Sequence, residues 1–324
     1  MAERLIGIVA IGRNEGERLK ACLRSLPPGL PAVYVDSAST DGSADFARAM
    51  GAQVVDLDLT RPFTAARARN AGFERLLRTA PEVELVQFID GDCELESGWI
   101  DAAAERLRHV PALAAVCGRR REKFPDRSFY NALCDREWDT PVGLTNACGG
   151  DALFKVPPLR QAGGFDPALT AHEEPDLCSR LRAAGFLIER LDLPMTRHDA
   201  DITSFHQFWR RNTRAGYGYA QVAAKHRGAR DNPARDLLRR TVRWGFILPA
   251  LCLLASVAFA PWGLLTWGIF PLQIARRAIL GRLGWQRASV ELLQKFAELK
   301  GAVVWLNDRV RNRQRDAVQY KSAG

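Results

Sequence analysis

Asp90 and Asp92, with Gly91 between them, end an apolar run that begins at Leu85. If that run is a strand, both carboxylates point to the same side, because side chains alternate along a strand. Two oxygen donors on one side suit Mg²⁺ or Mn²⁺, which commonly complete their coordination with phosphate oxygens and water. A polar turn that closes a strand is the alternative, since Asp and Gly are ordinary turn residues. The triplet by itself therefore leaves a cation site and a turn open.

Further polar residues follow other apolar runs. Asp36 ends the run AVYVD, and Ser39 and Asp41 come within five positions of it. Carboxylates at this place could accept hydrogen bonds from a nucleobase or ribose, although Asp41 is also suited to cap the next helix. Arg67 and Arg69 lie one turn into a later helical pattern, where Arg suits phosphate or a solvated face. Carboxylates and arginines that converge on one sheet edge favour a nucleotide site.

The elements that hold these residues alternate between short β-rich runs and helical patterns over the first 120 residues. Such alternation is typical of βαβ units and of a mainly parallel sheet with covered faces. Ligands of such sheets bind beyond the carboxyl ends of the strands, which is where the polar residues lie. The expected strands are 5–12, 32–36, 52–58, 84–90 and 113–118, and the expected helices are about 15–26, 41–50, 64–78 and 98–109.

Residues 120–155 have a looser pattern, rich in turn formers and polar side chains, before a helical run at 174–185 and an apolar strand at 186–193. Long irregular stretches inside compact domains usually have a function. We expect this stretch to form the floor and lid of an acceptor pocket.

The two parts of the chain carry opposite charge. Residues 1–200 have 25 Lys and Arg against 30 Asp and Glu, whereas residues 201–324 have 21 against 7. The seven cysteines contain no CxxC pair and no signal peptide precedes the first apolar run, so we expect reduced thiols in the cytoplasm. The basic part lacks RNP-like and zinc-finger motifs, so a membrane surface is its expected partner and nucleic acid is not.

A long uncharged segment interrupts the basic part. Residues 245–275 have no charged side chain over 31 positions, more than the roughly 20 residues that cross a bilayer once. Pro261 breaks the segment near its middle, and arginines flank both ends, which places both ends on the cytoplasmic side. We predict a membrane-associated hairpin of two short helices; a buried helix pair packed on the preceding domain is the alternative. From residue 285 onward we expect an amphipathic helix that ends in a basic stretch.

Five motifs, in order, resemble those of the family 2 glycosyltransferases, which are inverting enzymes with the GT-A fold. They are an opening strand with an Asn-Glu turn that contains Glu15, then VDSASTDGS, ARARNAGF, the DGD triplet and GGFDPALTAHEEPDLCSRLRAAGF. The resemblance covers about residues 5–215. It implies an α/β nucleotide-diphospho-sugar transferase fold. One departure is that the family commonly has Glu-Asp where this chain has Glu173-Glu174, followed by Pro175.

The resemblance also implies roles for single residues. The second acidic residue of the Glu-Asp pair is the general base, here Glu174, with Glu173 as the alternative base. Both glutamates could instead complement the positive end of a helix. His198 resembles a histidine that contacts metal or diphosphate in some GT-A enzymes, and a structural role is its alternative. Trp138 and Asp139 lie where an acceptor site would form, and Trp138 suits either stacking on a sugar or core packing.

We therefore predict a metal-dependent, inverting transfer from a nucleoside diphosphate sugar to a carbohydrate or lipid-linked acceptor, in exopolysaccharide or cell-envelope synthesis at the cytoplasmic face of the membrane. Residues 1–225 form the predicted catalytic domain and residues 226–324 the basic helical region. A nucleotidyltransferase and a non-catalytic, membrane-docked nucleotide-sugar binding module are the alternatives. The predicted cation, Mg²⁺ or Mn²⁺, is assigned to Asp90, Asp92 and His198. The predicted substrate contacts are Glu15, Asp36, Ser39, Asp41, Arg67, Arg69, Asp90, Trp138 and Asp139.

Overall fold

The computed structural model describes residues 6–58, 60–281 and 284–313. The chain forms two compact units, one that ends at Ser204 and one that begins at Phe205. The predicted end of the catalytic domain at residue 225 is a statement about function, and it stays a prediction. The end of the predicted basic tail lies outside the described residues.

Four parallel strands form one half of the sheet in the first unit. In this half the spatial order is β3-β2-β1-β4, and the alternation of strands and helices in the sequence predicts such an arrangement. Gly12 pairs with Asp36, and Ile11 pairs with Asp90. Both aspartates therefore end their strands at the same edge of the sheet. The four strands are β1 (Ile6–Gly12), β2 (Ala32–Asp36), β3 (Gln53–Asp56) and β4 (Leu85–Asp90).

The rest of the sheet adds antiparallel pairs. β8 (Ala152–Lys155) lies between β4 and β6 (Leu113–Glu122) and is antiparallel to both. β6 also pairs in parallel with β9 (Leu187–His198), and the short strands β5 (Cys93–Leu95) and β7 (Gly143–Leu144) are antiparallel to β9. Because β8 runs against β4, Ala152 pairs with Phe88. The loop before β8 therefore returns to the carboxyl end of β4.

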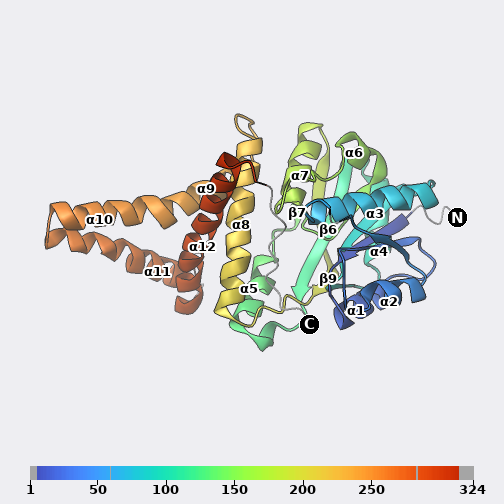
Figure 1. Cartoon of the computed structure of the whole chain (residues 1–324), viewed down its shortest axis with the longest axis horizontal. Helices are drawn as coiled ribbons and strands as arrows, with labels where there is room; N and C mark the ends of the chain where they lie inside the picture. Colours follow the sequence, from blue (N-terminus) through green and yellow to red (C-terminus); the bar gives the residue numbers. More distant parts are fainter. Residues whose placement is uncertain (1–5, 59, 282–283, 314–324) are drawn as a thin grey trace. The chain divides into compact units, whose positions relative to one another are not determined.

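Helices cover both faces of the sheet, and Figure 1 shows α3 on one side of the strands and α1 and α2 on the other. The alternation of side chains along β4 explains this. Phe88 packs against Phe73 of α3, with ring centroids 6.3 Å apart, whereas Gln87 accepts a hydrogen bond of 2.9 Å from the indole of Trp99 in α4. The helices of this unit are α1 (Glu17–Ser25), α2 (Ser43–Ala49), α3 (Ala65–Thr79), α4 (Trp99–His109), α5 (Phe129–Glu137), α6 (Val156–Gln161) and α7 (Glu173–Ala183), with a 3₁₀ turn at Pro125–Arg127.

One glycine sets how closely α3 approaches the sheet. A Cβ atom at Gly72 would lie only 2.4 Å from Cγ1 of Val9, so a larger residue there would push the helix outward. The helix begins at a good capping residue, since the side chain of Thr64 accepts a hydrogen bond from the main-chain N–H of Arg67. These two contacts fix the place of Arg69, which lies in the next turn of the same helix.

The second unit is helical. Its long helices α8 and α12 pack together through glycines: a Cβ atom at Gly216 would lie 1.8 Å from the carbonyl oxygen of Glu298, and one at Gly301 would lie 1.9 Å from that of Thr213. The expected helix from residue 285 onward is α12. The helices are α8 (Phe205–Lys225), α9 (Arg235–Val242), α10 (Leu248–Ala258), α11 (Ile269–Ile279) and α12 (Trp285–Val310), with a π-helical turn at Arg243–Ile247 and a 3₁₀ segment at Trp262–Gly268.

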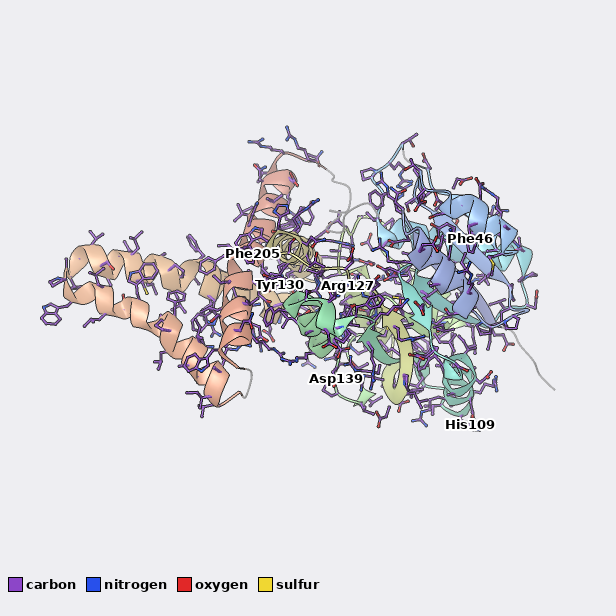
Figure 2. All side chains as sticks on the ribbon, turned by 90° about the horizontal axis from the view of Figure 1, so that it is seen from below. Phe46, His109, Arg127, Tyr130, Asp139 and Phe205 are labelled. Atoms are coloured by element: carbon purple, nitrogen blue, oxygen red, sulfur yellow. The ribbon has the colours of Figure 1, made fainter. Side chains whose placement is uncertain are left out.

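The uncharged segment folds back on itself, as the sequence predicts. The indole of Trp267 donates to Ser256 Oγ at 3.1 Å, and a Cβ atom at Gly263 would lie 1.9 Å from the carbonyl oxygen of Ala255. Figure 2 shows side chains that project away from both helices of this hairpin. Within the described residues one continuous helix, Arg235–Ala258, is long and apolar enough to cross a membrane; the most apolar part of it has a mean hydropathy of 1.7 and is 17% buried.

Candidate functional site

Arg69 links two of the predicted carboxylates at the end of β4. Its side chain is buried, and one guanidinium nitrogen lies 2.7 Å from Asp90 Oδ1 while the other lies 2.6 Å from Glu173 Oε1. The three residues come from β4, α3 and the start of α7, so the contact joins elements that are far apart in the sequence. Arg69 and Glu173 are therefore part of one ion-pair network with the first aspartate of the triplet.

Asp151 also belongs to this network, although no motif in the sequence points to it. It is fully buried and accepts hydrogen bonds from the main-chain N–H of Asp90 at 3.0 Å and from Thr196 Oγ1 at 2.9 Å. Arg120 Nη2 lies 2.6 Å from Asp151 Oδ2 and 3.6 Å from Asp90 Oδ2. The spacing between Asp151 and the DGD triplet matches no known motif. The relevant sequence feature is an acidic residue directly before β8, the strand that pairs with β4.

The two aspartates of this network have opposite pKa shifts. Burial raises the pKa of Asp90, and the charge of Asp151 adds to this, although Arg69 opposes it. Burial acts in the same direction on Asp151, but Arg120 and the N–H of Asp90 outweigh it and hold the pKa of Asp151 below its ordinary value. Asp151 is thus the firmly ionised member of the pair.

Asp92 lies beside His198, and its charge also acts on Asp90 and Arg120 of the ion-pair network. His198 Nε2 lies 3.3 Å from Asp92 Oδ2, and both side chains are largely buried. β5 and β9 bring the two residues together, since Cys93 pairs directly with His198 across the strands. The edge of the His198 ring packs on Trp138, with ring centroids 4.7 Å apart. The structure therefore gathers Asp92, His198 and Trp138 at one place.

The donor set at Asp92 fits a divalent cation. The oxygen of Asp92, the sulfur of Cys93 and a ring nitrogen of His198 lie within 4.8 Å of one another, which is close enough for one ion to contact more than one of them. Mn²⁺ accepts carboxylate oxygen and Mg²⁺ prefers it, with water and phosphate oxygens filling the other positions. Asp90 belongs to a second such group, with Cys93 and Asp151, and Arg69 contacts one of its carboxylate oxygens.

The predicted nucleoside residues join two neighbouring loops. Asp36 is buried and accepts the N–H of Ser39 at 2.7 Å, and Ser39 Oγ in turn accepts the N–H of Asn14 at 2.9 Å. Asp41 accepts the N–H of Gly16 at 2.8 Å and also that of Ser43 at the start of α2. The loops after β1 and β2 are thereby held together at the edge where a nucleotide would bind.

Hydrogen bonding also sets the charge of Asp41. Its partial burial raises the pKa, but the hydrogen bonds from Ser43 and Gly16 outweigh this and leave the pKa lower than usual. The sequence also allows Asp41 as the N-cap of α2, but the N-cap is Gly42 and Asp41 comes one residue before it. Asp41 is therefore a fixed anion at the loop, and its role toward a nucleoside stays a prediction.

Two other predicted substrate residues make contacts away from the ion-pair network. The guanidinium of Arg67 donates to the carbonyl oxygens of Asp58, Arg61 and Pro62, at 2.6–2.7 Å. These contacts close the loop before α3. Glu15 lies 2.9 Å from the guanidinium of Arg18. The structure does not bring Arg67 to the acidic residues of the triplet.

The two neighbouring glutamates of α7 have different surroundings. Whereas Glu173 contacts Arg69, the carboxylate of Glu174 accepts the N–H of Cys148 at 2.5 Å and the thiol of Cys178 at 2.9 Å. Burial raises the pKa of Glu174, and the hydrogen bonds from Cys178 and Cys148 offset this in part. Cys148 belongs to the loop before β8, so Glu174 lies against the stretch expected to line the acceptor pocket.

Trp138 and Asp139 follow directly after α5. The guanidinium of Arg120 lies over the Trp138 ring, 5.6 Å from its centroid. Asp139 is exposed, as Figure 2 shows, and pairs with Arg190 at 3.2 Å and with Arg119 at 3.4 Å. Trp138 therefore connects Arg120 of the ion-pair network to His198 beside Asp92.

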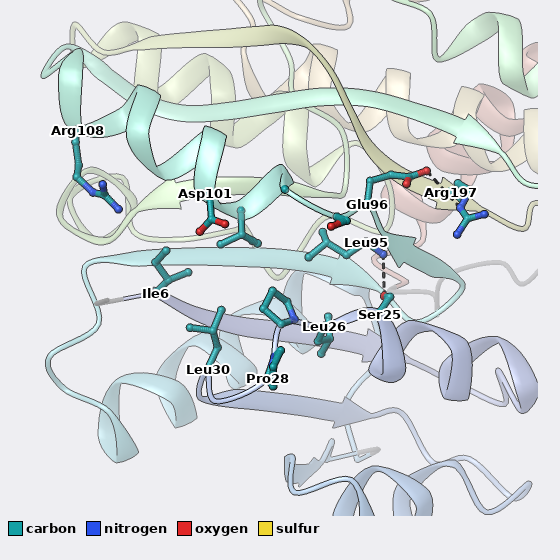
Figure 3. A pocket seen from close by; sticks show the side chains of 14 residues that line it. Ile6, Ser25, Leu26, Pro28, Leu30, Leu95, Glu96, Asp101, Arg108 and Arg197 are labelled. Atoms are coloured by element: carbon teal, nitrogen blue, oxygen red, sulfur yellow. Dashed lines mark hydrogen bonds and ion pairs between the residues drawn. The ribbon is translucent and has the colours of Figure 1, made fainter. Parts of the chain in front are cut away.

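A separate groove of about 820 Å³ lies at the other end of the first strands (Figure 3). It is lined by Ile6, by the loop before β2 and by the segment that leads into α4, and the N–H of Leu95 donates to Ser25 Oγ beside it. None of the residues in the ion-pair network lines this groove, so its volume gives no information about the site at β4.

Comparison with known proteins agrees with the resemblance seen in the sequence. Residues 8–155 match the model of glycosyl transferase family 2. The pre-mycofactocin glycosyltransferases of two Mycobacterium tuberculosis strains are each 26% identical over 242 residues, which is 69% of this chain. The chain spans about half, 49%, of the length of these curated relatives. The resemblance expected from the motifs is thus borne out as a similarity to this family over residues 8–155.

Solved structures confirm the fold. The mannosyltransferase PcManGT from Pyrobaculum calidifontis, in complex with GDP-Man and Mn²⁺, is 21% identical with a TM-score of 0.62, covering 94% of this chain and 87% of its own. S. aureus TarS (residues 1–349) is 13% identical with a TM-score of 0.52, covering 95% and 92%. The chain thus has the GT-A fold of glycosyltransferases, followed by a helical region.

Proposed function

We propose that the chain is a metal-dependent, inverting glycosyltransferase that moves a sugar from a nucleoside diphosphate sugar to an acceptor hydroxyl. The observation that carries the proposal is the arrangement at the carboxyl end of β4. There Asp90 is fixed by Arg69 and Asp151, while the neighbouring Asp92 faces His198. Ligands of parallel α/β sheets bind at this edge.

Asp92 and His198 are the residues that would hold Mg²⁺ or Mn²⁺. When bound, the cation supplies positive charge beside the diphosphate, which leaves poorly while its charge is uncompensated. The related PcManGT structure contains Mn²⁺, and the same class of ion suits the donors here. Asp90 is then proposed to position the triplet. Arg69 fixes its side chain, and the buried Asp151 fixes its main chain.

Arg69 is proposed as a positioning residue. Its two terminal guanidinium nitrogens already contact Asp90 and Glu173, and its side chain is buried. Those contacts align the triplet with the start of α7. Asp36 and Asp41 are proposed to bind the nucleoside, since they fix the two loops at the same edge of the sheet.

Glu174 is proposed as the general base. It takes the proton of the acceptor hydroxyl while that oxygen attacks the anomeric carbon from the face opposite the departing nucleotide, which inverts the configuration. Burial raises the pKa of Glu174, which makes it a better proton acceptor than an ordinary carboxylate once it is ionised. Glu173 is less suited to this task, because its carboxylate is paired with Arg69.

Trp138 is proposed to form one wall of the acceptor site. It packs on His198 and under Arg120, so an acceptor that stacks on its ring would lie near the cation. Glu174 contacts the loop at Cys148. This loop and Trp138 both belong to residues 120–155, which include α5, β7 and β8 and are not the irregular stretch that the sequence predicts. The acceptor is proposed to be a carbohydrate or a lipid-linked sugar of exopolysaccharide or cell-envelope synthesis.

The helical hairpin of the second unit is proposed to bind one leaflet at the cytoplasmic face of the membrane. Its outward side chains are large and apolar: Leu254 is 64% exposed, Val257 78% and Trp262 75%. Such a surface is costly in water, at about 25 cal/mol per Å² of apolar area. Arg243 precedes the hairpin and Arg276 follows its uncharged segment, so both ends face the same anionic head groups.

Product analysis tests the catalytic proposal. The purified full-length chain is incubated with GDP- and UDP-sugars, Mn²⁺ and acceptor lipids, and the released nucleotide is identified by chromatography. Release of a nucleoside diphosphate together with a β-linked product from an α-linked donor is expected. Release of pyrophosphate would point to a nucleotidyltransferase, and binding of donors without any release would point to a binding module; either result overturns the proposal.

Vesicle flotation tests the membrane proposal. Full-length protein is expected to float with vesicles that contain anionic lipid, and Leu254→Glu should reduce the floated fraction several-fold. Leu306→Glu is the matched control, because Leu306 is 55% exposed and lies on α12, outside the hairpin. Equal flotation of the two variants would contradict insertion of the hairpin.

A further inference from the structure

Three side chains near the active site form a cluster that the proposed sugar transfer does not explain. The sulfur atoms of Cys148 and Cys178 lie 3.6 Å apart, and Cys178 Sγ lies 2.9 Å from Glu174 Oε1. All three residues are buried, with 5%, 0% and 6% of their surface exposed. Two thiols and a carboxylate, within 4.8 Å of one another, constitute a set of donors for a soft metal ion.

The backbone explains why these donors converge. Glu174 and Cys178 are four residues apart in α7, so they lie on the same face one turn from each other. Cys148 comes from the loop before β8, and its main-chain N–H donates a hydrogen bond to the carboxylate of Glu174. One helix face and one loop thus provide the three donors, which is the usual construction of a small metal site.

The distances suit a tetrahedral thiolate site. In such a site the Zn–S bond is about 2.3 Å, so two bound sulfur atoms lie about 3.8 Å apart by tetrahedral geometry. The distance between Cys148 Sγ and Cys178 Sγ is 3.6 Å. A soft or borderline cation would therefore need only small movements of the side chains to be bound.

A further thiol lies near the cluster. Cys117, on β6, is 4% exposed. Its pKa is raised by burial and then by the charges of Glu174 and Cys178, which requires those groups to be close to it. Its sulfur is not among the three donor atoms that lie within 4.8 Å of one another, so the cluster itself combines residues from α7 and the loop before β8.

We propose that Cys148, Cys178 and Glu174 form a binding site for a thiophilic divalent cation such as Zn²⁺, and that an ion at this site inhibits sugar transfer. The proposed binding of the cation rests only on the geometry of these three side chains. The inhibition rests on the proposed function, because the cation would occupy the carboxylate that we assign as the general base. The site is separate from the one at Asp92, which faces His198.

The two sites differ in their number of sulfur donors, one (Cys93) beside Asp92 and two in the thiol cluster, and the Cys178 variants change only the second. Binding replaces the thiol proton of Cys148 and of Cys178 by bonds to the cation, and two protons are released to solvent. Mg²⁺ and Mn²⁺ prefer oxygen donors, whereas thiolates select ions such as Zn²⁺. The catalytic cation should therefore leave the thiol cluster empty, and micromolar Zn²⁺ should fill it in the presence of excess Mg²⁺.

Cadmium titration tests the binding directly. Full-length protein in a phosphine reductant is titrated with Cd²⁺ in excess Mg²⁺, and the thiolate-to-metal charge-transfer band in the ultraviolet is followed. We expect a saturating band in the wild-type chain and a loss of affinity of at least about tenfold in Cys178→Ala. Cys252→Ala, which removes a buried thiol from the second unit, should retain the band. Cys178→Ser, which keeps the size of the side chain, is the second variant if Cys178→Ala does not fold.

The outcomes separate the two parts of the inference. Absence of the band in the wild-type chain, or an unchanged band in both Cys178 variants, would overturn the metal site whatever the enzyme activity. A band without inhibition by Zn²⁺ would leave the site standing and contradict Glu174 as the base. If Zn²⁺ inhibits the wild-type chain and Cys178→Ser is inhibited at least about tenfold less strongly, both parts are supported.

Discussion

Asp90 donates its main-chain N–H to the carboxylate of Asp151 over 3.0 Å, although 61 positions separate the two residues in the chain. The contact exists because β8 runs antiparallel to β4 and brings its first residues to the end of that strand. The buried carboxylate of Asp151 also holds Arg120. The main chain of the first aspartate in the DGD triplet is thus fixed by a hydrogen bond to a second, buried aspartate.

This arrangement predicts a large loss of stability in Asp151→Ala. Arg120 would lose the anion at 2.6 Å from its guanidinium, and breaking a buried pair by removing one partner typically costs about 3 to 5 kcal/mol. Urea unfolding of the full chain measures the change. Asp139→Ala is the control, because Asp139 also pairs with arginines but its side chain is 62% exposed. Equal losses in the two variants would contradict the role assigned to Asp151.

The cation proposal predicts that Asp92→Ala abolishes transfer without unfolding the chain. Turnover should fall at least about 100-fold, since charge compensation at the leaving group contributes several kcal/mol. The increase in melting temperature on addition of Mn²⁺ and a nucleoside diphosphate should also disappear. Asp56→Ala is a matched control, because Asp56 ends β3 in the same sheet but is 75% exposed. Near wild-type transfer by Asp92→Ala would exclude Asp92 from the catalytic site.

The two glutamates of α7 should respond differently to substitution. Glu174→Gln is expected to reduce kcat by about 100-fold or more, as loss of a general base does. In the wild-type chain kcat should rise with pH on the acid side, with an apparent pKa above the ordinary value of 4.5, because burial raises the pKa of Glu174. Glu173→Gln removes a partner of Arg69 and should change this pH profile little. If Glu173→Gln is the inactive variant, Glu173 is the base.

Glu174 also predicts a pH dependence of stability. Because its pKa is higher in the folded chain than in the unfolded chain, the folded state binds the proton more tightly. The resulting stability is present below the unfolded value of about 4.5 and is lost as the pH rises through the folded pKa. Glu174→Gln cannot titrate, so the difference in unfolding free energy between wild type and variant should change over this range. A constant difference from pH 4 to 8 would argue against a raised pKa.

The close contact between α8 and α12 predicts a fifth effect. Gly216→Ala would place a methyl group 1.8 Å from the carbonyl oxygen of Glu298, so the helices must move apart at a cost of about 1 to 3 kcal/mol. Gly268→Ala meets no atom within 4 Å and serves as the control. Thermal unfolding of the full chain, followed by circular dichroism, measures both. A Gly216→Ala chain as stable as the control would show that the glycine contact is not limiting.

Much of the first unit could be predicted from its sequence. Strands such as 32–36 and 84–90 and helices such as 64–78 were located to within a few residues, because hydrophobic periodicity and turn residues are local signals. The hairpin was predicted in the same way, from an uncharged segment interrupted by Pro261. The described strands and helices of the first unit confirm those elements, and the membrane-associated hairpin stays a prediction.

The pairings between distant residues could not be predicted in this way. The contact of Asp151 with Asp90 depends on the direction of β8, which no residue within β8 specifies. Arg67 and Arg69 illustrate the same limit: both lie in the first turns of α3, yet Arg69 contacts Asp90 while Arg67 contacts the carbonyl oxygens of the preceding loop. Spacing placed both on the helix, but packing determined which one reaches the acidic residues.

The reversed direction of β8 has a consequence for how this protein can diverge. The connection between α5 and β8 starts and finishes at the mouth of the site, since Trp138 follows α5 and Asp151 precedes β8. Residues inserted or deleted between Trp138 and β7 would remodel this connection while β7 keeps its pairing with β9. Related proteins could thus come to use new acceptors through a change in the length of this one loop. The strands β1–β4, which hold the proposed nucleotide site, would keep their structure.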